Sequence, residues 1–265
     1  MATTIAVTSG KGGVGKTSIA VNLAITLKNL GSRVHLFDAD YGMANAHVLL
    51  GVNPEYVISD LIANKTDMKQ LVCNGPNGVK LISGGAGFIE LLNIENDVRY
   101  QTIRAMNAIE DDTDYLVVDV AAGASDGTLA FVAAADRVLV VLVGEPTSFL
   151  DAYALIKAAH LENGVRNFCV LVNMSSNDDQ AQSYFEKFRE TVSQFLDVSL
   201  HYVGAFPMSS KLRSSIVKRK PVSLDEANAK EILALQRIAA NVIKSPVNSP
   251  DGIRFFSGEA DKSEK

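Results

Sequence analysis

Residues 10–17 read GKGGVGKT and form the part of this sequence whose residue types and spacing most clearly predict chemistry. They fit the pattern G-x-x-x-x-G-K-[ST], in which glycines let successive backbone N–H groups surround a phosphate at the start of a helix. Lys16 would reach the β- and γ-phosphates of a nucleotide, and Thr17 would hold Mg²⁺. The residues expected to line the phosphates are Gly12, Gly13, Val14, Gly15, Lys16, Thr17 and Ser18.

Two apolar runs further along the chain end in carboxylates that suit the same chemistry. Residues 34–37 predict a buried strand that leads into Asp38 and Asp40, and residues 115–118 predict another that ends at Asp119. Open α/β sheets bind their ligands at the carboxyl ends of the strands, where an aspartate of a phosphate-loop protein holds the magnesium. We therefore expect Asp119 to bind Mg²⁺ through water.

The phosphate loop needs a strand before it and a helix after it, and the sequence predicts both. Residues 4–8 form an apolar run, and apolar residues at helical spacing follow the loop as far as Gly31, a typical residue after a helix end. Further strands are predicted at 79–82, 138–143, 168–172 and 202–206, and helices at 98–109, 148–160, 178–195 and 224–243. This alternation predicts an α/β fold with a mostly parallel, twisted sheet of about seven strands and helices on both faces.

The sequence predicts one folded domain followed by a tail. We assign residues 1–244 to a single domain, because no internal repeat or second domain is visible. Residues 245–265 are rich in Ser, Pro, Gly and acidic residues, so we expect them to be disordered apart from the apolar segment GIRFF at 252–256.

The charge and the cysteines exclude several classes of protein. A net charge of −5 gives no general attraction to nucleic acid or anionic lipid. Cys73 and Cys169 match no metal or redox spacing. No signal peptide precedes the first strand, and no apolar segment approaches the roughly 20 residues that span a bilayer. We expect a soluble, cytoplasmic protein.

A second lysine in the loop, Lys11, makes the pattern more specific. With it, residues 11–17 fit K-G-G-x-G-K-[ST], and the chain resembles the deviant-Walker family of MinD and ParA ATPases, which are P-loop NTPases of the SIMIBI type. In that family the extra lysine reaches across a nucleotide-sandwich dimer to the partner's phosphates. The resemblance implies this role for Lys11, whereas the residue alone could equally be a solvated loop lysine.

The resemblance extends over nearly the whole chain and implies further roles. Asp38 and Asp40 resemble the start of the family's switch I, in which Asp40 would orient the attacking water and Asp38 would lie near the magnesium. The residues alone leave open that Asp40 only supports the metal from a distance. Gly123 resembles the switch II glycine, whose backbone N–H approaches the γ-phosphate.

A nucleobase site is also implied by the resemblance. Asn173 matches the asparagine that reads the adenine, and Pro207 and Met208 match the loop that covers it. The chain departs from the family at two positions: Met174 replaces a frequent basic residue, and Ser209 replaces a frequent aspartate. Base recognition is therefore less firmly predicted than phosphate recognition.

Residues 144–147 and 151–155 most resemble the flagellar-number regulators called FlhG, FleN or YlxH. The residues implied in the switches and the dimer contact are Lys11, Asn45, Gly123 and Asp151. These regulators usually carry an N-terminal extension, whereas this sequence opens at the first strand, so the flagellar assignment is less firmly predicted than the family. The tail carries one arginine beside its two phenylalanines and is followed by acidic residues, so we expect membrane attachment to be weak or absent.

The resemblance implies an ATPase that uses ATP and Mg²⁺ as a dimerisation switch and hydrolyses ATP slowly. A homodimer would number or position a cellular structure through a protein partner, for example a flagellar GTPase or a transcription regulator, and could reach the cell periphery or a pole through it. Four alternatives stay open: a non-hydrolytic scaffold, a MinD-like division-site regulator, a small-molecule ligase or kinase, and a ParA-like cargo-positioning ATPase that contacts DNA through the basic residues 211–220. An electron-transfer ATPase is disfavoured because no cysteine follows Gly123 until Cys169.

Overall fold

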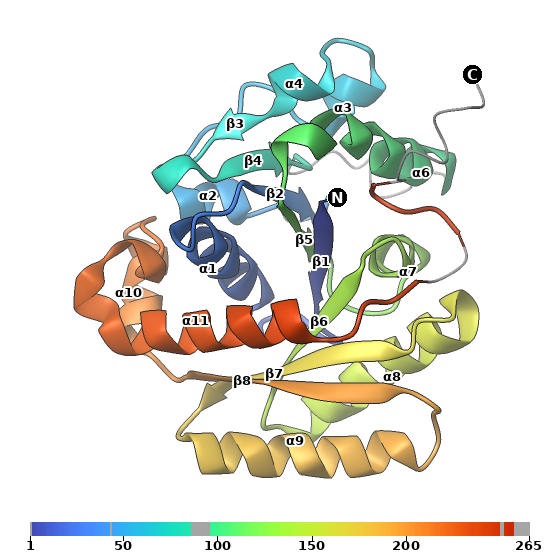
Figure 1. Cartoon of the computed structure of the whole chain (residues 1–265), viewed down its shortest axis with the longest axis vertical. Coiled ribbons are helices and arrows are strands. Elements are labelled where there is room, and N and C mark those ends of the chain that lie inside the picture. The colour runs from blue at the N-terminus through green and yellow to red at the C-terminus, as the bar shows by residue number, and fades with distance from the viewer. Residues whose placement is uncertain (1, 43, 86–95, 250–251, 257–265) are drawn as a thin grey trace.

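The computed structural model describes residues 2–42, 44–85, 96–249 and 252–256, and Figure 1 shows their arrangement. Within them, eight strands form one sheet in the order β3-β4-β2-β5-β1-β6-β7-β8. The strands are β1 (Thr3–Thr8), β2 (Val34–Ala39), β3 (Cys73–Asn74), β4 (Lys80–Ser83), β5 (Tyr115–Val120), β6 (Arg137–Val143), β7 (Asn167–Ser175) and β8 (Ser199–Pro207). All neighbours are parallel except β3, which is antiparallel to β4.

Helices cover both faces of this sheet, as predicted. One face packs against α1 (Lys16–Asn29), α2 (Ala46–Leu50), α10 (Ser210–Val217) and α11 (Ala229–Lys244). The other packs against α3 (Ile58–Ile62), α4 (Met68–Leu71), α6 (Asn96–Ala105), α7 (Asp126–Ala133), α8 (Pro146–Asn163) and α9 (Asp178–Ser193). None of the helices in the described ranges is long and apolar enough to cross a lipid bilayer.

The seven predicted strands are all present, and the prediction of an α/β fold with a mostly parallel sheet is confirmed. Their apolar runs are nearly continuous because helices cover both faces of the sheet, so side chains of both orientations are buried. The eighth strand, β3, has two residues, too few for any periodic pattern. Short 3₁₀ turns at Pro76–Gly78, Met106–Asp112, Val222–Leu224 and Glu226–Asn228 complete the connections.

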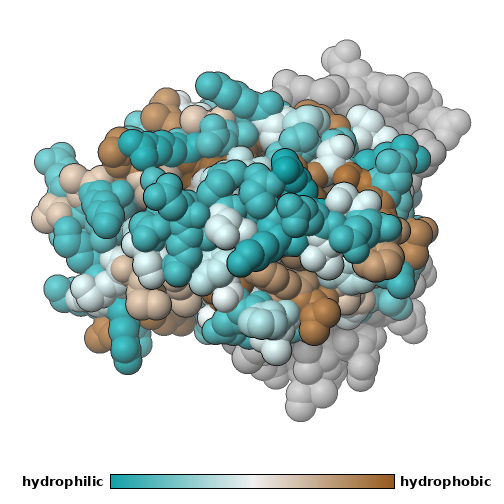
Figure 2. Space-filling view, turned by 90° about the horizontal axis from the view of Figure 1, so that it is seen from below, coloured by the Kyte–Doolittle hydropathy of each residue, from teal (hydrophilic) through white to brown (hydrophobic). Residues whose placement is uncertain are grey.

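The outer face of α9 is mostly polar and faces solvent. The helix turns Phe185 and Phe188 toward the sheet and leaves its polar side chains outside. Figure 2, which looks from below at the side where α9 lies in Figure 1, shows a largely hydrophilic surface with small hydrophobic patches.

The described part of the C-terminal segment packs against the domain. In the described part of the segment, residues 245–249 and 252–256, Phe255 is buried and its ring stacks on Phe131 of α7 with ring centroids 6.1 Å apart. Phe256 is buried in the same core. Both rings belong to the apolar segment 252–256, which the prediction of disorder excepted. The rings are not available as a membrane anchor in this conformation.

Hydrogen bonds hold the rest of this segment to the sheet. The Asn248 side chain accepts the N–H groups of Arg166 and Asn167 at 3.2 and 2.9 Å, and its amide donates to the Asn167 carbonyl at 2.8 Å. Arg254 forms an ion pair with Asp136. Residues 245–249 therefore differ from the predicted disorder, from which 252–256 were excepted, while residues 250–251 and 257–265 lie outside the described ranges.

We predict that Phe255→Ala lowers the free energy of unfolding by about 3 kcal/mol, because truncation of a fully buried phenylalanine removes apolar burial and leaves a cavity. Urea unfolding followed by circular dichroism measures the change. Val247→Ala, at an exposed position of the same segment, is the control and should change stability by less than about 0.5 kcal/mol. Equal unfolding midpoints for Phe255→Ala and the unchanged protein would contradict the packing of this segment.

Candidate nucleotide-binding site

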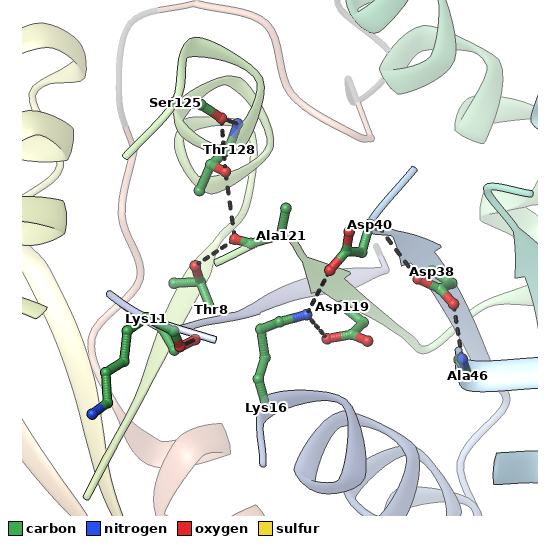
Figure 3. Close-up of polar contacts among 11 residues, drawn as sticks. Thr8, Lys11, Lys16, Asp38, Asp40, Ala46, Asp119, Ala121, Ser125 and Thr128 are labelled. Atoms are coloured by element: carbon green, nitrogen blue, oxygen red, sulfur yellow. Dashed lines mark hydrogen bonds and ion pairs between the residues drawn. The ribbon is translucent and has the colours of Figure 1, made fainter. Parts of the chain in front are cut away.

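Lys16 lies at the centre of the candidate site. It is the first residue of α1, is almost fully buried, and points toward the carboxyl ends of β5 and β2 (Figure 3). Its Nζ atom donates to Oδ1 of Asp119 at 2.6 Å and lies 3.8 Å from Oδ2 of Asp40. The sheet order brings these residues together, because β5 lies between β1 and β2.

Asp38 and Asp119 form a second, fully buried pair of carboxylates. They stand opposite each other in the register of β2 and β5. Burial and the neighbouring Asp119 raise the pKa of Asp38 to about 7. Burial also raises the pKa of Asp119, while Lys16 opposes this shift. The pair is therefore short of compensating positive charge.

Asp38 has partners that Asp119 lacks. Its Oδ2 accepts the N–H of Ala46 at 2.9 Å, and its Oδ1 accepts the N–H of Asp40 at 3.3 Å. Asp119, in contrast, has a buried Oδ2 with no hydrogen-bond partner among the described residues. Asp38 thus holds the start of α2, and Asp119 keeps one oxygen free.

The donor set fits magnesium in part. No group of three or more His, Cys, Asp and Glu side chains that could hold a metal occurs in the described part of the chain. Nevertheless, the Thr17 side chain lies close enough to Asp119 to lower the pKa of that carboxyl, and the Oδ2 atom of Asp119 has no hydrogen-bond partner among the described residues. A hydroxyl and carboxylates are the hard oxygen ligands that Mg²⁺ takes together with substrate phosphates and water. Thr17 and Asp119 therefore fit a magnesium site whose remaining ligands would come from water and a bound nucleotide.

The glycines of the loop leave space for an anion and allow close packing elsewhere. A Cβ atom at Gly12 or Gly13 would meet nothing within 4 Å, so this side of the loop is open. Gly15 has φ +87°, and a Cβ there would lie 2.5 Å from Nδ2 of Asn173. No side chain in the described ranges caps the start of α1, whose free N–H groups suit a phosphate. Val14 and Ser18 are buried beside this helix start.

Hydrogen bonds hold the segment after β5 against the loop. The backbone N–H of Gly123 donates to the Ser9 carbonyl at 2.9 Å. The Ala121 carbonyl accepts the hydroxyls of Thr8 and Thr128, both at 3.4 Å, and Ser125 caps α7 (Figure 3). The predicted contact between Gly123 and a phosphate would require its bond to Ser9 to break.

The Lys11 side chain points out of the candidate site of its own chain. Figure 3 shows its side chain pointing away from Lys16 and the carboxylates. Its Nζ lies 2.7 Å from Oε2 of Glu145 and 3.1 Å from Oγ1 of Thr147, and its side chain is 30% exposed. Glu145 and Thr147, which begin α8, were not predicted as partners because 134 and 136 residues separate them from Lys11.

The other residues predicted at the dimer contact also lie at or near the surface. Asn45 precedes α2 and is exposed. Asp151 on α8 is partly exposed, and its backbone packs so closely on Gly10 that a Cβ there would lie 2.1 Å away. The loop, the start of α2 and α8 therefore border the same site.

The residues predicted to bind the base lie on the opposite side of β1 from the carboxylates. Asn173 near the end of β7 is buried, donates from Nδ2 to the Val14 carbonyl at 2.7 Å, and accepts the N–H of Met174 at 2.9 Å. Pro207 ends β8, and the exposed Met208 follows it. The structure thus brings Asn173 to the loop, but both polar ends of its amide already have partners.

A cavity of about 150 Å³ beside Asp40 was not predicted. It is lined by residues of β2, β5, α6 and α7, among them Tyr41, Arg99 and Ser125. Besides Asp40, a signal for this cavity in the sequence is Ser125, which precedes helical residues in the manner of an N-cap. Arg99 comes from a distant helix, and nothing near it in the sequence points to the site.

Comparisons with known proteins agree with this geometry. The family model ParA, described as NUBPL iron-transfer P-loop NTPase, matches residues 1–243. Antiactivator FleN of Pseudomonas aeruginosa is 39% identical over 254 residues, which are 95% of this chain and 91% of that protein. Flagellum site-determining protein YlxH of Helicobacter pylori is 34% identical over 217 residues, covering 82% and 73%.

A solved structure supports the same conclusion. In the MinC:MinD cell division protein complex of Aquifex aeolicus, a chain aligns with a TM-score of 0.74 and 26% identity over 94% of this chain and 98% of that one. MinD of Pyrococcus furiosus, 20% identical, shares the fold with a TM-score of 0.75. A phosphate loop with two lysines, an aspartate at the end of β5 and the match over residues 1–243 lead to one conclusion: the chain belongs to the ParA and MinD family of P-loop ATPases.

Proposed function

We propose that this ATPase is an ATP-dependent dimerisation switch that hydrolyses ATP slowly and regulates the number or placement of flagella. The observation that carries the switch is the direction of Lys11. Lys11 points away from its own carboxylates and is partly exposed, and this supports a role toward a second molecule once its ion pair with Glu145 opens.

The chain's own residues would bind the nucleotide in two steps. The open side of the loop at Gly12 and Gly13 and the uncapped start of α1 would receive the phosphates. Lys16, whose charge Asp119 and Asp40 now balance, would then turn toward the β- and γ-phosphates. Mg²⁺, held by Thr17 and through water by Asp119, with Asp38 nearby, would neutralise charge on the phosphates.

Hydrolysis would depend on positioning and on charge stabilisation. Asp40 is partly exposed beside Lys16, so it can contact a water molecule that enters from solvent, whereas Asp38 and Asp119 are fully buried. Lys11 of the partner subunit and the protein's own Lys16 would stabilise the charge of the transferring phosphoryl group. The greater exposure of Asp40 supports it as the residue that orients the attacking water.

Two connections could report the state of the nucleotide at the surface. Asp38 holds the N–H of Ala46, so a change at the carboxylates would move the exposed Asn45. Gly123 would exchange its bond to Ser9 for the γ-phosphate. Both changes would reshape the face on which a second copy, and then a protein partner, docks.

The cellular role rests on the relatives. The names of FleN and YlxH, an antiactivator and a flagellum site-determining protein, support flagellar regulation through a protein partner. Among the described residues, no contact favours the DNA-binding alternative. Within the basic residues 211–220, Lys211 is already engaged with the Ala227 carbonyl at 2.7 Å and lies 3.8 Å from Glu231.

We predict that an Asp40→Ala variant with ATP and Mg²⁺ forms a homodimer, because hydrolysis is blocked while the phosphate loop and Lys11 remain. Light scattering coupled to size-exclusion chromatography measures the mass at tens of micromolar protein. The same variant with ADP should stay mainly monomeric and is the control. A monomer with ATP as well would refute the sandwich dimer.

Alanine substitutions of the two loop lysines should impair different steps. Lys16→Ala should abolish tight ATP binding, whereas Lys11→Ala should keep the nucleotide affinity of the monomer and lose both dimerisation and hydrolysis. Lys11→Arg should also lose turnover, because a planar guanidinium replaces a compact ammonium. The measurements are fluorescent-nucleotide titration and phosphate release against protein concentration, with Lys187→Ala on the exposed side of α9 as the control.

The outcome for Lys11 separates a dimeric mechanism from a monomeric one. Turnover per subunit of the unchanged protein should rise with concentration as dimers form. Normal turnover of Lys11→Ala, together with a rate per subunit that does not depend on concentration, would mean that Lys11 is a surface lysine and that the enzyme works as a monomer.

The flagellar role predicts a phenotype in the protein's own host. Deletion of the gene should change the number or position of flagella, counted by electron microscopy, and a gene encoding Lys16→Ala should fail to restore the pattern. Normal flagellation of the deletion strain would refute this role and leave the ATPase assignment intact.

A further inference from the structure

The cavity beside Asp40 lies where two segments of the candidate site meet. Its walls come from residues 39–42 at the end of β2 and from residues of the segment 120–128, which joins β5 to α7. Arg99 of α6 and Phe131 of α7 complete the lining. The volume of about 150 Å³ is enough for several water molecules, and therefore for a small oxyanion.

This cavity joins the interior of the site to the surface of the protein. Figure 3 shows Ser125 and Thr128 above Asp40, whereas the Lys16 side chain approaches Asp40 from below. Of the residues that line the cavity, Tyr41 and Thr128 are buried, while Ser125 is exposed. An ion that enters the cavity beside Asp40 can therefore leave it beside Ser125.

One wall of the cavity carries positive charge. A Cβ atom at Gly127 would lie 2.9 Å from Nε and 3.1 Å from Cζ of Arg99, so the guanidinium group lies against the backbone at the start of α7. The start of a helix is the positive end of its dipole. Among the described residues that line the cavity, Arg99 is the only basic one and Asp40 the only acidic one. The exposed Asp126, in the first turn of α7, does not line it.

Two hydroxyl groups add hydrogen-bond donors to this wall. Tyr41 lines the cavity, and its buried Oη atom has no hydrogen-bond partner among the described residues. A buried hydroxyl without a partner is unfavourable, so a ligand that accepts its hydrogen bond would bind with that advantage. Oγ of Ser125 accepts the N–H of Thr128 at 3.4 Å, and a hydroxyl that accepts one bond can still donate another. A guanidinium with hydroxyl donors suits a phosphate.

Hydrolysis of ATP would produce such an anion at the edge of this cavity. Water attacks the γ-phosphorus roughly in line with the bond to ADP, so the phosphoryl group moves away from ADP and toward the attacking water. Asp40, the residue proposed to orient that water, lines the cavity. The products are ADP, inorganic phosphate and a proton. The carboxylate of Asp40 then repels the phosphate, whereas Arg99 attracts it.

We propose that this cavity is a subsite for inorganic phosphate, the product of ATP hydrolysis, in which Arg99 pairs with the anion and the hydroxyls of Tyr41 and Ser125 donate to it. The inference rests on the proposed function, which places the attacking water at Asp40. The subsite holds phosphate after its separation from ADP and before its release beside Ser125. One subunit can therefore bind ADP and phosphate at the same time, at separate places.

A titration of inorganic phosphate into protein saturated with ADP and Mg²⁺, followed by phosphorus NMR at constant ionic strength, tests this inference. We expect a dissociation constant of about 1 to 10 mM, because a few contacts with a small ion supply little free energy. No binding of phosphate in this range would overturn the proposal.

Matched arginine variants on α6 (Asn96–Ala105) locate the bound phosphate. Arg99→Gln should weaken phosphate binding about 10-fold or more, because it removes a charge-assisted hydrogen bond, and Arg99→Lys should restore part of the affinity. ADP does not reach the cavity, so its affinity should stay nearly the same. Arg104→Gln removes the same charge from the same helix at a position that does not line this cavity, and is the control. Equal weakening by Arg99→Gln and Arg104→Gln would overturn the proposal.

A tyrosine variant separates binding from folding. Tyr41→Phe removes only the Oη atom and should weaken phosphate binding about 2- to 10-fold. Because this atom has no partner among the described residues, the substitution should not lower the unfolding temperature in phosphate-free buffer. Thermal unfolding also checks that Arg99→Gln is folded. If Arg99→Gln and Tyr41→Phe both bind phosphate as tightly as the unchanged protein, phosphate occupies the phosphate loop and the proposal is wrong.

Failure of this proposal can be told apart from failure of the proposed function. If ADP with Mg²⁺ does not bind the unchanged protein, the nucleotide site itself is wrong and the subsite falls with it. If ADP binds and Lys16→Ala abolishes its binding, but phosphate binding does not depend on Arg99, only the subsite is wrong. Phosphate bound through Arg99 by a protein that hydrolyses no ATP would not be a product and would also overturn the proposal.

Discussion

The rest of the structure depends on the buried ammonium group of Lys16 and the carboxylates around it. A charged group can be buried only where opposite charge compensates for the lost water, and here Asp119 and Asp40 supply it. The arrangement requires β5 between β1 and β2, with their carboxyl ends level, which only a parallel sheet provides. Lys16 must leave these carboxylates when the phosphates of a nucleotide bind. The ion pairs therefore stabilise this conformation and must also open for the ligand.

The parts of the site that the sequence predicted are those set by short-range patterns. The phosphate loop, Asp119 and the seven longer strands were readable because glycine spacing and continuous apolar runs are local signals. The partners of Lys11 were not readable, since a contact across 134 residues leaves no local pattern. The order of residues 245–249 was missed because composition records polarity but not the hydrogen bonds that Asn248 forms with Asn167, 81 residues away in the sequence.

Met174 illustrates a different limit. The sequence showed that it replaces a frequent basic residue, and this substitution made base recognition less certain. Its direction depends on a one-residue slip between β7 and β8, which side-chain periodicity within a single strand does not reveal. Departures from a family pattern therefore become interpretable only when the backbone shows where the altered side chain points.

Asp136 joins the two ends of the described chain. Its carboxylate accepts the N–H and the hydroxyl of Thr4 at 2.8 and 2.9 Å and also pairs with Arg254, while its carbonyl accepts the N–H of Asn248. β1 and the last described segment thus both contact Asp136, which lies in the middle of the sequence. During synthesis this corner of the sheet stays incomplete until residues 248 and 254 have left the ribosome, because both are far in sequence from Asp136. A nascent chain that has not reached them leaves the Asp136 carboxylate without its pairing to Arg254.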